Sequence, residues 1–134
     1  MPAWVRAVIP MLVCADAAAE VEFLKAAFGA MELSRRPGAD GSVVHATLAI
    51  GENLVMVHGE ADHLASSAPR QDGSSPVAIY VYLEGVDAAI ERAVAAGARV
   101  LLPAEDAFWG DRVGRIIDPS GHVWNVASRA DEGR

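Results

Sequence analysis

The sequence is poor in several residue types, and each shortage excludes a class of protein. It has one cysteine, Cys14, among 134 residues, so no disulfide can form within the chain, as suits a reducing compartment. No apolar run approaches the ~20 residues of a membrane span. Pro2, Arg6 and Pro10 interrupt any pattern typical of a secretory signal. We therefore expect a cytoplasmic protein that has no membrane partner.

Positive charge is also scarce. The chain has 11 Lys and Arg against 18 Asp and Glu, a formal net charge of −7, and no run of basic residues. A nucleic-acid partner is not expected, because binding phosphate backbones needs clustered positive charge. Hydrophobic residues make up 52% of the sequence and charged residues 22%, as in an ordinary folded protein. The length predicts a single domain over residues 1–134.

The sequence does contain an internal repeat. Residues 110–126 read as a strand, a tight turn and a strand, and the turn Asp118-Pro119-Ser120-Gly121 has the residue types that β-turns favour. Residues 47–57 have the same layout around Gly51. Aligning Gly51 with Gly121 sets an offset of 70 residues between two halves. We expect two copies of one supersecondary unit that share a core.

Hydrophobic periodicity predicts the same element order, β-α-β-β-β, in both halves. In the first half the expected strands are 8–13, 33–36, 43–50 and 54–58, with a helix over 17–28. In the second half they are 77–83, 99–102, 113–117 and 123–126, with a helix over 87–96. Asp16 and Asp87 are the expected N-caps, and Gly29 and Gly97 the expected helix ends. The polar segment 59–76 would connect module 1 (about 4–60) to module 2 (about 77–129).

Several short motifs resemble one known superfamily over nearly the whole chain. They are Phe23-Leu24, Ala27-Phe28-Gly29-Ala30, Val86-Asp87-Ala88, Ala95-Ala96-Gly97-Ala98, Phe108-Trp109-Gly110-Asp111-Arg112 and Asp118-Pro119-Ser120-Gly121-His122. In this the sequence resembles the vicinal oxygen chelate superfamily of glyoxalase I, extradiol dioxygenases and the bleomycin- and fosfomycin-resistance proteins. The resemblance implies an α+β fold. Two βαβββ modules in tandem, each a curled mixed sheet covered by a helix, would form a cup-shaped cavity.

The resemblance also implies where a family metal would be bound. The position in the last strand is Asn125, the offset places its counterpart at Val55, and the first-strand positions fall at about Ile9 and Ala78. Three of these side chains are hydrocarbons, and one neutral amide does not hold a divalent ion. We therefore expect neither a metal nor another cofactor.

Strand alternation then predicts which side chains face the cup. From the four family positions, the cup would hold Val55 with Val57, Tyr80 with Tyr82, and Asn125. His45 and Arg115 would face it as counterparts under the repeat, and Trp109 would lie on a loop beside it. Cys14 would face the helix and be buried. The expected ligand-binding residues are His45, Tyr80, Tyr82, Trp109, Arg115 and Asn125, with no catalytic residue assigned.

The function that this pattern favours is binding and sequestration of a small drug or metabolite, of the bleomycin-resistance type, by a homodimer. A largely apolar cavity with a few polar groups suits a small organic ligand. One alternative is a glyoxalase-like metal-dependent lyase, isomerase or dioxygenase. A second is a metal-free enzyme with His45 as general base. A third is a small regulatory or immunity partner with no cavity. In a different strand register, His45, His58 and Glu60 would form a nonstandard metal site.

Overall fold

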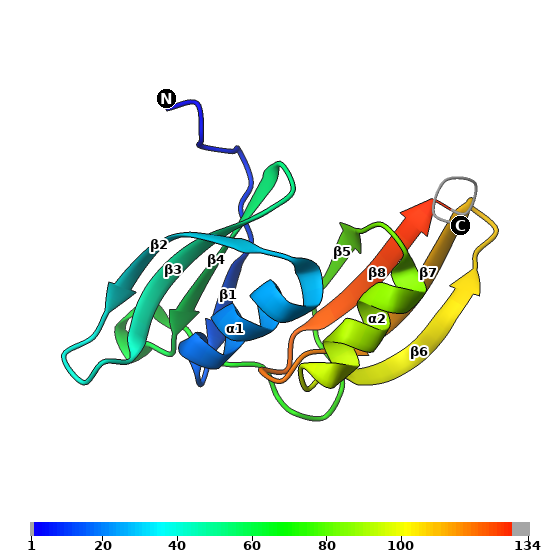
Figure 1. Cartoon of the computed structure of the whole chain (residues 1–134). Coiled ribbons are helices and arrows are strands. Elements are labelled where there is room, and N and C mark those ends of the chain that lie inside the picture. Colours follow the sequence, from blue (N-terminus) through cyan, green and yellow to red (C-terminus); the bar gives the residue numbers. More distant parts are fainter. Residues whose placement is uncertain (1, 130–134) are drawn as a thin grey trace.

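The structure, a computed structural model, describes residues 2–129 (Figure 1). The first half contains β1 (Met11–Cys14), α1 (Ala17–Phe28), β2 (Met31–Pro37), β3 (Val43–Ile50) and β4 (Asn53–Gly59). A connecting segment with a short 3₁₀ helix, η1 (Asp62–Leu64), leads to the second half. That half contains β5 (Ala78–Tyr82), α2 (Val86–Ala95), β6 (Arg99–Asp106), β7 (Asp111–Ile117) and β8 (Val123–Arg129).

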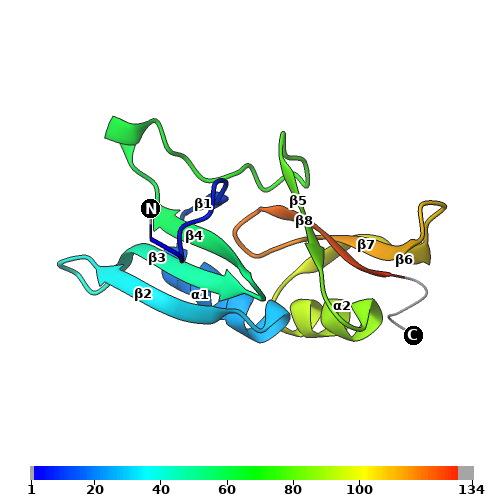
Figure 2. The same cartoon turned by 90° about the horizontal axis from the view of Figure 1, so that it is seen from above.

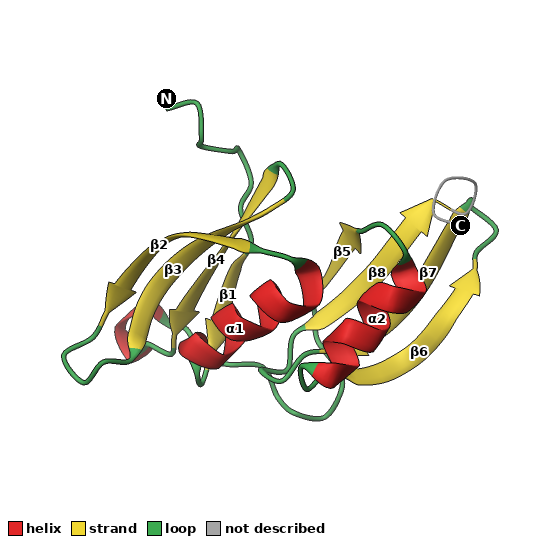
Figure 3. Ribbon diagram, in the orientation of Figure 1, coloured by secondary structure: helices red, strands yellow, loops and turns green. Residues whose placement is uncertain are grey.

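Each half forms one four-stranded mixed sheet with one helix. The strand orders are β1-β4-β3-β2 and β5-β8-β7-β6, and in each sheet the first pair is parallel and the others are antiparallel. Both helices lie on one side of the two sheets (Figures 2 and 3), and the connecting segment lies on the other. This confirms the expected α+β fold of two tandem βαβββ modules. We call the sheet surface away from the helix the open face of its module.

The two helices begin differently. As expected, Asp16 caps α1: its Oδ1 accepts a hydrogen bond from Ala19 N at 3.1 Å, and Gly29 ends the helix at φ +67°. The expectation that Asp87 caps α2 is wrong. The N-cap is Gly85, which has no side chain to donate or accept, and the Asp87 carboxylate pairs instead with Arg112 at 2.8 Å.

The helices and sheets enclose one core that is continuous between the modules. Phe28 at the end of α1 packs edge-to-face on Trp124 of β8, with ring centroids 4.8 Å apart. Trp124 is 2% exposed, and Cys14 is fully buried, as expected for a side chain that faces the helix. Burial raises the pKa of the Cys14 thiol to about 12, so it stays protonated and inert at neutral pH.

Turn length decides which residues of β4 face the core. The β3–β4 turn contains two residues, between the paired Ile50 and Asn53, whereas the β7–β8 turn contains five, between Ile117 and Val123. Because this difference is odd, the offset of 70 residues does not preserve the facing of the strand that follows the turn. The expectation that Val55 and Val57 face the cup is therefore wrong.

Both valines are buried in the core beneath α1, at 3% and 0% exposure. Their neighbours Leu54, Met56 and His58 lie on the open face instead, because successive side chains of a strand point to opposite sides. His58 is thereby paired directly with His45 across β3 and β4.

Candidate functional site

The open face of module 2 brings four of the expected site residues together. Tyr80 of β5 pairs with Asn125 of β8, and Asn125 pairs with Arg115 of β7. Tyr82 lies two residues along from Tyr80 and faces the same way. The strand alternation expected for this sheet is therefore present.

At one end of this face lies Asp111, which is completely buried. Its Oδ2 accepts hydrogen bonds from the Tyr80 hydroxyl at 2.6 Å, the Tyr82 hydroxyl at 2.7 Å and Trp109 Nε1 at 3.1 Å. Its Oδ1 accepts one from Arg129 Nη1 at 2.9 Å, which is also an ion pair. A carboxylate can accept this many bonds only in its ionised form.

These bonds fix the protonation states of the cluster. The hydrogen bond from the Tyr80 hydroxyl is the first cause that lowers the pKa of Asp111, followed by the Tyr82 hydroxyl, the indole N–H of Trp109 and the charge of Arg129. Burial and the bond to Asp111 raise the pKa of Tyr80, and the bond to Asp111 raises that of Tyr82. Asp111 is thus held as an anion and both phenols as neutral donors, and none of the three is poised to exchange protons near neutral pH.

With their polar atoms held, the aromatic rings form an exposed platform. The Tyr80 and Tyr82 ring centroids are 5.4 Å apart and tilted by 52°, and these residues are 41% and 56% exposed. Trp109, half exposed, is held by Asp111 and also donates to the Tyr80 hydroxyl at 3.1 Å. Phe108 packs edge-to-face on Trp109 and is almost fully exposed. Rings fixed in this way suit stacking on a flat ligand, since little side-chain entropy is lost on binding.

A cationic group lies on the same face. Arg115 donates from Nε to Asn125 Oδ1 at 3.0 Å. Within residues 2–129 its two terminal nitrogens have no hydrogen-bond or ion-pair partner. Arg115 therefore offers the paired N–H groups that recognise a carboxylate or phosphate in two-point fashion.

Comparison with known proteins identifies the family. The family model of the Glyoxalase/Bleomycin resistance protein/Dioxygenase superfamily matches residues 6–126. The chain belongs to this superfamily. An uncharacterized protein of Mycobacterium bovis, Mb0911c, is 40% identical over 129 residues, which are 94% of this chain and 85% of that protein.

Solved structures of other proteins have the same fold. TioX from Micromonospora is 29% identical, with a TM-score of 0.72 over 93% of this chain and 99% of that one. The fosfomycin resistance protein FosX from Listeria monocytogenes, solved with Mn(II) and sulfate, is 18% identical, with a TM-score of 0.69 over 100% and 98% of the two chains. At that identity the match to FosX shows the fold alone.

The residues at the superfamily's metal positions do not fit a divalent ion. Ile9 and Ala78 carry no donor atom, and the corrected register replaces Val55 on the open face with its neighbour Met56, whose thioether is a poor ligand for hard cations. The amide oxygen of Asn125 is already bonded to a guanidinium. Within residues 2–129, no group of three or more His, Cys, Asp and Glu side chains has a geometry that could hold a metal ion.

Two pockets border the aromatic platform. One, of roughly 390 Å³, lies between the modules and is lined by Tyr80 and Tyr82 together with Pro10 and Leu54. The other, also roughly 390 Å³, lies beside Trp109. These volumes are in the range of small-molecule sites.

None of the helices described within residues 2–129 is long and apolar enough to cross a membrane.

The observed site differs from the expected one at two residues, His45 and Asp111. His45 lies on β3 in the other module and lines a separate pocket, so one chain does not bring it together with the other five. Asp111, which organises the aromatic platform, was not among the expected site residues. Strand alternation is the signal that could have identified it. Asp111 and Arg115 lie four residues apart on one strand, an even spacing, and so share a face.

Proposed function

We propose that this protein binds and sequesters a small planar organic molecule that carries an anionic group, without a metal and without chemical conversion. The site is the open face of module 2, where Tyr80, Tyr82 and Trp109 stack on the ligand and Arg115, held by Asn125, pairs with its charge. A site of this kind combines an apolar surface with a few oriented polar groups.

The observation that carries the proposal is the set of bonds to Asp111. A catalytic acid or base needs a pKa near the working pH and a free position at which to exchange its proton. Asp111 has neither, because four donors hold it as an anion. The two phenols donate to the same carboxylate and have raised pKa values. The arrangement stabilises a rigid surface, which favours binding over catalysis.

The superfamily supports the same direction, since its description includes bleomycin resistance proteins. Sequestration is a mechanism that needs no chemistry on the bound drug. We place the protein in the cytoplasm, where the lone, buried Cys14 has no need of a disulfide partner.

We also propose that the protein works as a homodimer. Large apolar side chains are exposed on the open faces and at the loop beside the platform, among them Met11 (50%), Leu102 (59%) and Phe108 (98%). Exposed apolar groups gathered in this way mark interaction surfaces. Light scattering after gel filtration should give twice the chain mass, and Phe108→Ser should shift the equilibrium toward the monomer. A monomer at all concentrations would contradict this part of the proposal.

Naphthalene compounds test the binding site itself. We expect 1-naphthoate to quench Trp109 fluorescence and to raise the melting temperature, whereas 2-naphthol, which lacks the carboxylate, should bind more weakly. Arg115→Met should weaken naphthoate binding by about fivefold while leaving naphthol binding nearly unchanged, because a solvent-accessible charge pair contributes about 1 kcal/mol. Arg70→Gln, which removes an exposed arginine elsewhere, is the matched control.

Two results would overturn this proposal. Equal naphthoate affinities for the Arg115→Met and Arg70→Gln variants would remove Arg115 from the site. One tightly held metal ion per subunit, found by elemental analysis of the purified protein, would favour the metal-dependent alternatives instead.

A further inference from the structure

A row of nitrogen-bearing side chains crosses the open face of module 1. Arg36 of β2 pairs with His45 of β3, and His45 pairs with His58 of β4. Directly paired residues of neighbouring strands point to the same side of the sheet and lie next to one another. Three adjacent strands therefore present one guanidinium and two imidazoles in a line.

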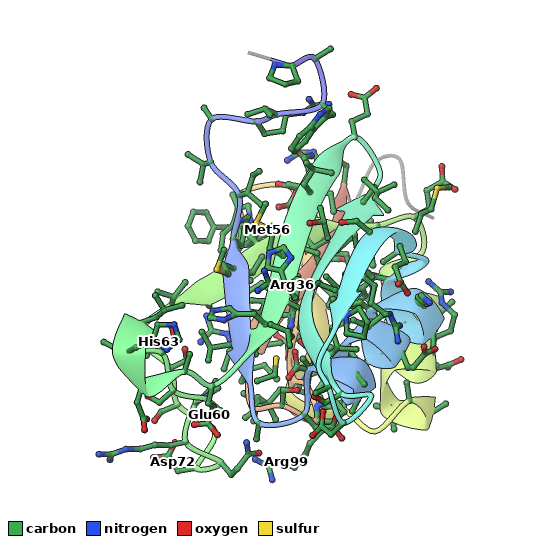
Figure 4. The ribbon with its side chains drawn as sticks, turned by 90° about the vertical axis from the view of Figure 1, so that its left-hand side faces the viewer. Arg36, Met56, Glu60, His63, Asp72 and Arg99 are labelled. Atoms are coloured by element: carbon green, nitrogen blue, oxygen red, sulfur yellow. The ribbon has the colours of Figure 1, made fainter. Side chains whose placement is uncertain are left out.

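The row forms one wall of a pocket of roughly 360 Å³. The segment after β4 supplies another wall with Glu60 and His63, which Figure 4 shows on the side of the strands away from α1. Met11 and Leu64 add apolar surface. The pocket is thus built from all four strands of module 1 and η1, and it lies in a different module from the aromatic platform.

The nitrogen atoms in this pocket lack protein partners. Within residues 2–129, the side chains of Arg36, His45, His58 and His63 have no hydrogen-bond or ion-pair partner, although His58 is only 7% exposed. The neighbouring arginine on β2 shows the contrast, since Arg35 is paired with Glu32 at 2.7 Å.

The charged and titratable groups that face the row come from several elements of module 1. Arg36 contributes from β2 and His58 from β4, and His63 lies across the pocket. The acidic groups nearby are Glu60, whose Oε2 already accepts a hydrogen bond from Ala68 N at 3.1 Å, and Asp62 of η1. Burial first, and then the nearby His58 and Arg36, lower the pKa of His45. An anion between these groups would relieve their mutual repulsion and favour their protonated forms.

We propose that this pocket binds a tetrahedral oxyanion, such as a phosphate group, and that its affinity rises as the pH falls. Arg36 supplies a two-point contact to two oxygens, and His45 and His58 donate from their ring nitrogens to the others. The site is independent of the aromatic platform, so either site can fail its test without the other.

Sulfate is the first probe, because it remains a dianion from about pH 5.5 to pH 8 and any pH dependence then belongs to the protein. We expect calorimetry to show binding at least about tenfold tighter at the lower pH, as one or more imidazoles gain a proton on binding. Imidazole ¹⁵N spectra should show the signals of both His45 and His58 moving on titration. Arg36→Gln should weaken binding by about tenfold, whereas the exposed Arg70→Gln control should not.

A second comparison identifies the source of the oxyanion. Inorganic phosphate and phenyl phosphate are titrated at one pH. Tighter binding of phenyl phosphate would assign the pocket to the anionic group of an organic molecule in contact with Met11 and Leu64. Equal affinities would assign it to the free anion.

The proposal is overturned if Arg36→Gln binds sulfate as tightly as Arg70→Gln, or if affinity does not change with pH. It is also overturned if the His45 and His58 signals respond to Zn²⁺ but not to sulfate, which would make the row a metal site. Arg36 is exposed, so its substitution leaves the fold intact and the comparison interpretable.

Discussion

Two buried carboxylates, Asp111 on the open face of module 2 and Glu20 on α1, have opposite surroundings. Both are completely inaccessible to solvent. Asp111 accepts four hydrogen bonds, whereas neither oxygen of Glu20 has a partner within residues 2–129. The pKa of Asp111 is lowered by its donors, and that of Glu20 is raised by burial and by the nearby carboxylate of Asp118. Burial alone therefore does not decide the charge of a carboxylate. The donors around it do.

The surroundings of Glu20 explain why it has no donors. It faces the junction between the modules, where the nearby Asp118 carboxylate of the β7–β8 turn takes the hydrogen bonds of Ser120 N, His122 N and Trp124 Nε1. Two carboxylates this close do not both ionise, and Glu20 is the one that remains protonated near neutral pH. The junction thus contains a neutral acid, Glu20, and the open face of module 2 contains an anion, Asp111. Substituting each residue in turn tests this difference.

The largest effect should come from Asp111→Asn. An amide removes the negative charge and keeps only one acceptor oxygen, so its NH₂ group must face either Arg129 or the donors of Tyr80, Tyr82 and Trp109, and those bonds are lost. We expect the melting temperature to fall by roughly 10 °C at neutral pH, measured by circular dichroism. Asp40→Asn, in the exposed β2–β3 hairpin, is the control. Equal melting temperatures for the two variants would show that the bonds to Asp111 do not stabilise the fold.

Glu20→Gln should change the melting temperature in the opposite direction and raise it. The folded protein holds the Glu20 proton above the unfolded pKa of about 4.5, so wild-type stability falls as pH rises above that value. Glutamine is neutral at every pH, so the variant should melt about 5 °C higher near pH 8 and at the same temperature as wild type near pH 4. A variant that melts lower than wild type at pH 8 would contradict a protonated Glu20.

The pH dependence of the Asp111 variant should be the reverse. Because the folded pKa of Asp111 is lowered, its stabilisation is present above the unfolded value of about 3.8 and is lost as the pH falls through the folded value. The penalty of Asp111→Asn should therefore shrink by several degrees between pH 7 and about pH 3. Melting curves of the variant and wild type at both pH values provide the measurement. A penalty that grows in acid would show that Asp111 is not held as an anion.

The smallest effects should come from the tyrosines. Tyr80→Phe removes one bond to Asp111 and one from Trp109, whereas Tyr82→Phe removes only the bond to Asp111. We expect losses of roughly 3 °C and 1 °C, because both hydroxyls lie in exposed side chains that water can solvate. The double variant should lose less than the sum if Asp111 couples the two. Strict additivity would mean that the bonds are independent.

Most of the fold follows from sequence periodicity, because helix stripes and strand alternation are local signals. The bounds of α1 and its Asp16 cap are confirmed, as is the order of all ten main elements. The errors lie where the structure of a segment depends on contacts with residues distant in the sequence. Strand β6 continues to Asp106, beyond the expected residue 102, because Glu105 and Asp106 pair with β7 after an irregularity that contains Pro103.

The candidate site was less accessible to sequence reasoning. Alternation placed Tyr80, Tyr82, Arg115 and Asn125 on one face, as the register confirms. It failed for Val55, because facing in β4 depends on the length of the preceding turn and not on an offset between halves. It gave no role to Asp111, because an acidic residue at the start of a strand looks like a solvated end until β5, β8 and the preceding loop bring four donors to it.

The contacts between the modules do not depend on the segment that connects them. His122 bonds through Nε2 to the Val13 carbonyl at 2.8 Å, and Arg92 of α2 donates to the Ala27 carbonyl of α1 at 3.3 Å. Together with the Phe28–Trp124 contact, these ties determine how the halves fit. A protease cut near Ser67 would therefore leave two fragments that recognise each other without the covalent link. The two halves would then associate as two separate chains do in a heterodimer. The connecting segment near Ser67 is therefore a suitable place to split the chain for fragment complementation.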